Sequence, residues 1–215
     1  PALGIGIPVG KDSLSMRTTW SEAGETRQVV GPLSLIVSAF APCDDVRPTW
    51  TPALRTDFGP TDLILIDLAR GARRLGGSIL AEVHGQTGDE TPDLDEPALI
   101  KALYAALAEL RVAGLVLAYH DRSDGGLFVT VAEMAFAGRT GVRIDLAPVA
   151  SSEAVLAGLF AEELGAVVQV LRSERERVLA ILARNGLPAE VIGELDPADR
   201  ITVRRGGTAL LDETR

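Results

Sequence analysis

The sequence is poor in cysteine, aromatic residues and long apolar runs. Its only cysteine, Cys43, excludes a disulfide framework within the chain and a zinc site with several cysteine ligands, and it indicates a reducing, cytoplasmic setting. No apolar run reaches the roughly 18 residues that a bilayer-spanning helix needs, so we expect neither such a helix nor a signal peptide. Acidic residues outnumber basic ones by 30 to 21, which argues against nucleic acid and a membrane surface as partners.

The 215 residues, 47% of them hydrophobic, are enough for one large domain or two small ones. Strand and helix patterns alternate in the central part, and antiparallel pairs close the end, which is typical of an α+β or mixed α/β fold. Strands are expected at 5–7, 14–18, 31–42, 61–68, 115–119, 142–146, 166–171, 191–195, 201–205 and 208–211. Helices are expected at about 97–112, 127–137, 152–163 and 173–186.

An irregular stretch at 44–60, with three prolines and a glycine among its turn residues, is the best candidate for a module boundary. The opening residues from Pro1 have the pattern of the middle of a strand, so we expect the chain to be part of something longer. Further along, Ser173 and Glu176 have the spacing of a capping box for the last helix.

The strongest local signal for chemistry is the glycine-rich turn at 120–126 (HDRSDGG), between an expected strand and an expected helix. Gly125 and Gly126 let the backbone approach a ligand closely, and the start of a helix offers unpaired N–H groups to a phosphate. Asp121 and Asp124 flank Ser123 and could offer oxygen ligands to Mg²⁺. The same residues also suit a simple helix cap.

A second candidate is the turn Gly10-Lys11-Asp12-Ser13, where a lysine beside glycine and serine could neutralise phosphate charge. It does not match the P-loop, because the glycine spacing is wrong and Asp12 replaces the Ser or Thr. A plain surface turn between strands is the alternative.

The other reactive residue types give weaker signals. The adjacent carboxylates at 44–45 disfavour a reactive Cys43 thiolate, and His84 at a strand end is best interpreted as structural. Glu162 and Glu163 are expected on a solvated helix face.

Two stretches indicate a family by their residue types as well as by the spacing of those residues. Residues 7–16 (IPVGKDSLSM) and 118–127 (AYHDRSDGGL), continued by AEMAFAG at 132–138, resemble the large single-chain form of phosphoribosylformylglycinamidine synthase. Stretches at 32–35, 75–78 and 162–170 are similar to it as well, so the resemblance runs in order through nearly the whole chain.

The resemblance implies a ligase of purine biosynthesis that uses ATP and ammonia from glutamine to convert formylglycinamide ribonucleotide to its amidine, releasing glutamate, ADP and phosphate. The family's full chain has two modules related to aminoimidazole ribonucleotide synthetase, followed by a glutaminase domain. Residues 1–59 would be a β-rich remnant of the second module's N-terminal half, and residues 60–215 its C-terminal half. The other domains of that polypeptide would be its partners, and this part would be inactive alone.

Carried over by residue, the resemblance makes Asp121 a Mg²⁺ ligand and Ser123 a nucleotide contact. Gly125 and Gly126 of the same turn are expected to bind the nucleotide as well. It places Gly10, Lys11 and Ser13 in a turn that, in shorter family forms, touches ATP, metal and substrate. Lys11 departs from those forms, which have a metal-binding Asn there, because a cation cannot ligate Mg²⁺ but can pair with phosphate. The implied cofactors are Mg²⁺ and ATP or ADP.

A noncatalytic scaffold, in which Mg-nucleotide only ties domains together, is the main alternative. The resemblance supports it, since the nucleotide site of the second module in large forms is thought to be auxiliary. A free-standing small-molecule kinase is disfavoured, because the chain has no evident pair of nucleophile and base.

Overall fold

The computed structural model describes residues 2–11, 16–31 and 35–215. The chain divides into two compact units, residues 1–48 and 49–215. Residues 49–59 therefore group with the second unit. The division into two half-modules at residues 59 and 60 stays a prediction.

The described part of the first unit contains one antiparallel hairpin. Its strands β1 (Arg17–Glu22) and β2 (Glu25–Val30) are joined by Ala23 and Gly24, both with positive φ, as a two-residue hairpin turn requires. The expected strands at 5–7 and 35–42 are irregular instead. Leu35, Ile36 and Phe40 are 88%, 90% and 96% exposed, so the prediction of a buried strand over 31–42 is wrong for 35–42. An apolar strand needs a neighbour to pair with and cover it, and the described residues of this unit provide none for 35–42.

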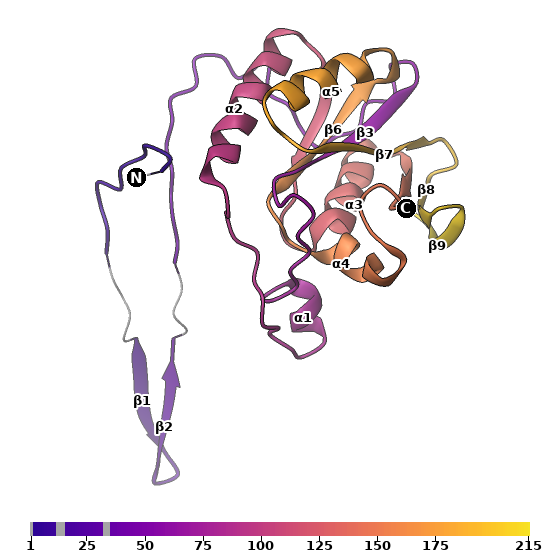
Figure 1. Cartoon of the computed structure of the whole chain (residues 1–215). Coiled ribbons are helices and arrows are strands. Elements are labelled where there is room, and N and C mark those ends of the chain that lie inside the picture. The colour runs from indigo at the N-terminus through magenta and orange to yellow at the C-terminus, as the bar shows by residue number, and fades with distance from the viewer. Residues whose placement is uncertain (1, 12–15, 32–34) are drawn as a thin grey trace. The chain divides into compact units, whose positions relative to one another are not determined.

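The second unit is built on a seven-stranded mixed sheet with the order β4-β6-β3-β7-β5-β8-β9 (Figure 1). All neighbouring strands are antiparallel except β5 and β8, which are parallel. The strands are β3 (Thr61–Asp67), β4 (Val116–Asp121), β5 (Gly141–Asp145), β6 (Gly165–Leu171), β7 (Ala189–Asp196), β8 (Arg200–Arg205) and β9 (Thr208–Thr214). The helices are α1 (Ile79–Val83), α2 (Pro97–Val112), α3 (Gly126–Gly138), α4 (Val155–Phe160) and α5 (Arg175–Arg184).

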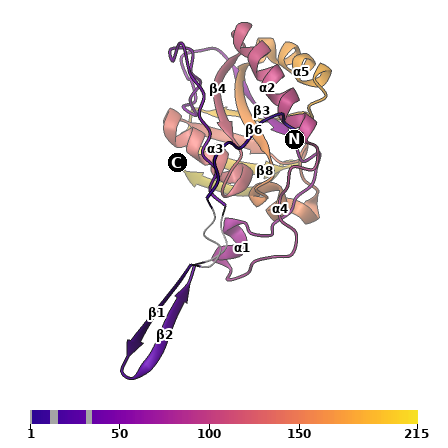
Figure 2. The same cartoon turned by 90° about the vertical axis from the view of Figure 1, so that its left-hand side faces the viewer.

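Helices cover both faces of this sheet (Figure 2). The core follows from the alternation of side chains along β3, all of whose residues are buried. Leu63 and Leu65 belong to the apolar cluster with α3 and α4. Ile64 and Ile66 belong to the cluster with α2 and α5. A strand buried on both faces fixes the register of the sheet, because a slip by one residue would exchange the two clusters.

The expected α+β class with a mixed sheet and packed helices is confirmed. Three local predictions are wrong. His84, expected at a strand end, is the C-cap residue of helix α1. The helix expected to run to 163 ends at Phe160, so residues 161–164 form a bend before β6. The capping box fails because Ser173 lies inside a short 3₁₀ turn (Arg172–Glu174), and α5 begins after Glu174 without a side-chain cap. No helix in the described ranges has both the length and the apolar character to span a membrane.

Candidate functional site

The turn after β4 lies at the end of the sheet where β3 also ends and β6 begins. The register pairs Asp121 with Ala166 and Asp67 with Gly165, so these strand ends are neighbours. The bend at 161–164 enters β6 at the same end. Three segments that are far apart in the sequence therefore meet at the predicted site.

The two glycines of the turn are required by its conformation. Gly125 and Gly126 have φ values of 78° and 65° and are both buried. A Cβ on Gly126 would lie 2.7 Å from the carbonyl oxygen of Leu159, so the start of α3 is packed against the end of α4. Asp121 and Ser123, in contrast, are exposed. The turn therefore presents side-chain oxygens to solvent, while its glycine backbone faces the protein interior.

A carboxylate of the protein occupies one amide of this turn. Glu162 Oε1 accepts a hydrogen bond from the N–H of Gly125 (2.8 Å) and a second from the N–H of Ile79 (2.9 Å). α3 has no side-chain cap of its own, so Glu162 provides the anion at this turn. The prediction that Glu162 lies on a solvated helix face is wrong, because the helix has already ended.

Arg122 fixes the turn from the interior of the protein. Its side chain is 1% exposed, pairs with Asp67 (Nη2 to Oδ1, 2.7 Å) and donates to the carbonyl oxygens of Glu163 (2.5 Å) and Leu164 (3.0 Å). Burial alone would raise the pKa of Asp67, but Arg122 and Arg73 outweigh it and hold that pKa below its usual value. The turn is thus fixed to β3 and β6 by a buried ionic cluster.

A second buried pair fixes the loop before α1. Glu163 is fully buried, and its carboxylate accepts three hydrogen bonds from Arg74, of 2.8 to 2.9 Å. Burial would raise the pKa of Glu163, but the bonds from Arg74 lower it overall. Arg74 also pairs with Asp95 at 3.0 Å. Like its neighbour, Glu163 is therefore an internal anchor and not the surface residue that the sequence pattern predicts.

Asp121 has the chemistry of a magnesium ligand without a preformed ligand set. Its carboxylate is 69% exposed and lies 3.5 Å from His120 Nδ1, whose Nε2 contacts Glu133 at 2.8 Å. In the described part of the chain, no three His, Cys, Asp or Glu side chains are grouped as a metal site would require. Asp121 and Ser123 offer the oxygen donors that Mg²⁺ prefers, so they fit a metal that brings phosphate and water as its other ligands.

The remaining predicted site residues belong to the first unit. Gly10 and Lys11 are exposed there, and Ser13 lies outside the described residues. Cys43 is exposed and donates to the carbonyl oxygen of Asp45, as expected of a loop cysteine. The roles of all these residues stay predictions.

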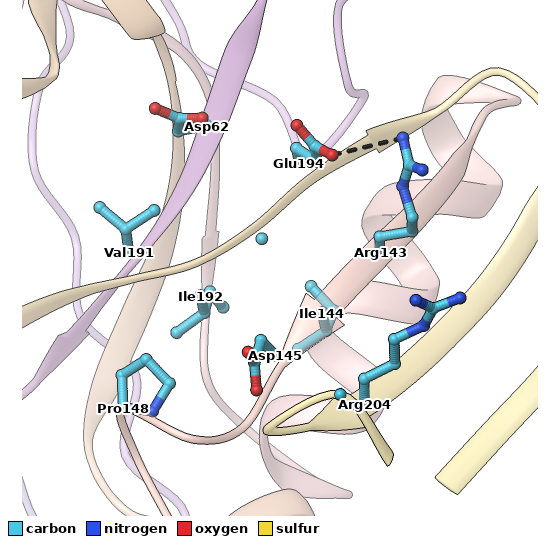
Figure 3. Close-up of a pocket in the computed structure, with 11 residues that line it drawn as sticks. Asp62, Arg143, Ile144, Asp145, Pro148, Val191, Ile192, Glu194 and Arg204 are labelled. Carbon is cyan, nitrogen blue, oxygen red and sulfur yellow. Dashed lines mark ion pairs between the residues drawn. The ribbon is translucent and has the colours of Figure 1, made fainter. Parts of the chain in front are cut away.

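The sheet also carries a hollow of about 450 Å³ that the sequence did not indicate (Figure 3). The pairing of β5 with β7 ends at Ile144 and Gly193, and the hollow opens beside that point. Its charged lining residues include Asp62, Arg143, Asp145, Glu194 and Arg204. None of the lining residues is a predicted site residue, and the carboxylates of Asp62 and Glu194 are already paired with arginines.

Comparison with known proteins identifies the family. The model of the AIR synthase related protein, C-terminal domain, matches residues 63–206, which is more than half of the chain. The chain belongs to the AIR synthase related proteins. The model of the FGAR-AT PurM_N-like domain matches residues 1–42. The resemblance seen in the sequence is thereby confirmed.

Solved structures show the same fold. Thermotoga maritima PurL complexed with ATP is 19% identical with a TM-score of 0.60, and the match covers 88% of this chain and 28% of that one. The same protein complexed with FGAR is 22% identical with a TM-score of 0.61, over 76% and 28% of the two chains. Escherichia coli HypE, a hydrogenase maturation protein, is 24% identical with a TM-score of 0.50, over 78% and 51%. The chain thus spans just over a quarter of the length of the PurL chain.

Proposed function

We propose that the chain is part of a phosphoribosylformylglycinamidine synthase, the ATP-dependent ligase that converts formylglycinamide ribonucleotide to its amidine with ammonia from glutamine. The observation that carries the proposal is the order of the two family matches. An FGAR-AT PurM_N-like match over residues 1–42 precedes an AIR synthase-type C-terminal domain over 63–206. That order is expected for the two halves of one synthetase module.

Within this module, Asp121 ligates Mg²⁺ and Ser123 contacts the nucleotide. The support is geometric, because both side chains are exposed on a turn whose backbone is held by buried ion pairs and glycine packing. Bound Mg²⁺ would neutralise the charge of a polyphosphate. Asp121 would then orient the metal, and the Ser123 hydroxyl would donate to a phosphate oxygen. Gly10, Lys11 and Ser13 of the first unit are proposed as nucleotide contacts by the resemblance alone.

The proposal extends to the partners and setting of the whole enzyme. A PurL of the same fold has been solved with ATP and with FGAR, which supports these two ligands for the complete enzyme. The other domains of the polypeptide, including a glutaminase, would supply ammonia in the cytoplasm. On this reading the 215-residue chain binds nucleotide but does not turn over substrate alone.

Calorimetric titration of the chain with Mg-ADP and Mg-ATP tests the nucleotide site. We expect saturable binding that requires Mg²⁺ and that weakens by about tenfold or more in Asp121→Ala, because a first ligand of the metal is lost. Glu213→Ala is the matched control, since it removes one exposed carboxylate from β9. Absence of binding by the unmodified chain, or equal binding by both variants, would refute the site.

The nucleotide at this site could be structural and not take part in the reaction. The Asp121→Ala variant of the complete enzyme distinguishes the two functions. The departure at Lys11, a cation where shorter forms use a metal-binding Asn, favours this second function. If Asp121→Ala abolishes nucleotide retention and lowers stability while folded enzyme keeps its turnover, the module is a scaffold. If turnover is lost with stability unchanged, the site is catalytic.

A further inference from the structure

The side chain of Glu162 joins two turns that the sequence places far apart. One carboxylate oxygen accepts from the N–H of Gly125 and from the N–H of Ile79, at 2.8 and 2.9 Å. Gly125 is the residue before α3, and Ile79 is the first residue of α1. The carboxylate thus serves the starts of both helices, where backbone N–H groups lack partners within the helix.

The backbone beneath Glu162 is held in place on both sides. Arg122 donates to the carbonyl oxygen of Glu163, and Arg74 binds the carboxylate of Glu163. These bonds tie the bend at 161–164 to the turn and to the loop before α1. The half-buried Glu162 side chain therefore projects from a fixed base, and Gly125 and Ile79 are positioned relative to it.

We infer that Glu162 is a positioning residue for the glycine-rich turn at 120–126, an inference that rests on the proposed function. By binding the Gly125 amide, it sets the direction in which Asp121 and Ser123 leave the turn. Because that amide is occupied, the nucleotide is held through the metal on Asp121 and the hydroxyl of Ser123, and not through the N–H of Gly125.

Amide hydrogen exchange and Mg-ADP titration of the 215-residue chain test this role together. In Glu162→Ala we expect the Gly125 and Ile79 amides to exchange faster together, since both lose the acceptor that Glu162 provides. We also expect the dissociation constant of Mg-ADP to rise about tenfold, as is typical when a residue that orients a ligand is removed. Glu162→Gln keeps an oxygen that accepts hydrogen bonds and should restore most of the protection and affinity. Glu153→Ala, which removes an exposed carboxylate ahead of α4, should resemble the unmodified chain.

Three results would contradict the inference. Unchanged exchange at both amides in Glu162→Ala would show that the bonds do not hold the turn. Faster exchange with unchanged Mg-ADP affinity would show that the turn does not depend on Glu162 for binding. Failure of Glu162→Gln to recover any affinity would remove the role of the acceptor oxygen. If the unmodified chain binds no Mg-ADP, the proposed function fails, whereas binding that is indifferent to Glu162 refutes only this inference.

Discussion

Replacement of Arg122 by methionine measures how strongly the buried cluster holds the candidate site. The change leaves Asp67 buried with fewer partners and removes the donor to the Glu163 carbonyl. Removing one member of a buried ion pair typically costs about 3 to 5 kcal/mol. Asp67 keeps Arg73 at 2.8 Å and the N–H groups of Ala69 and Gly71 at 3.3 and 3.2 Å. The cost should therefore fall near the lower end, at about 3 kcal/mol.

Urea unfolding followed by far-ultraviolet circular dichroism provides the measurement. With a denaturant slope of about 2 kcal/mol per molar urea, a loss of about 3 kcal/mol lowers the midpoint by roughly 1.5 M. Arg200→Met is the matched control, because its pair with Asp212 is exposed and should contribute far less to stability. Equal losses in the two variants would refute the argument that burial makes the Arg122 pair important.

Three other predictions test local features of the second and first units. Burial raises the pKa of Tyr119 to about 12, so its ultraviolet titration in Tyr104→Phe should have a midpoint near that value. Since the folded pKa is raised, the contribution of Tyr119 to stability should be lost as the pH rises from about 10, its unfolded value, toward 12; a midpoint near 10 would contradict this. Gly126→Ala should destabilise by more than about 2 kcal/mol, whereas Gly186→Ala, also at positive φ but with open space around it, should cost about 1 kcal/mol by the same unfolding assay. The exposed apolar stretch 35–40 should drive self-association that Phe40→Asp reduces; monodisperse monomer in light scattering of the unmodified chain would count against it.

The core of the second unit was predictable from the sequence because its signals are periodic and local. The apolar alternation at 61–68 gave a strand within one residue of β3, and Pro97 marked the start of α2. The irregular backbone at 35–42 was not predictable in the same way. Its pattern is that of a buried strand, but burial depends on a neighbour that the described part of the first unit lacks.

The candidate site shows a similar division. Gly125 and Gly126 identified the turn, because two glycines between a strand and a helix allow the positive φ values that this turn requires. The two glutamates were misassigned because charged residues after an amphipathic helix usually extend its solvated face. The early end of α4 at Phe160 turns them inward, at the point where Gly126 packs against the backbone of α4. Such long-range contacts leave no periodic signal.

The four residues between α4 and β6 place two neighbouring acidic side chains on different tasks, one at the amides of Gly125 and Ile79 and the other at Arg74. Each carboxylate reaches its partners because the two side chains point in different directions as the chain enters β6. A deletion or insertion of a single residue here would turn both carboxylates away from these partners. We therefore expect natural variants of this segment to keep both its length and its two carboxylates.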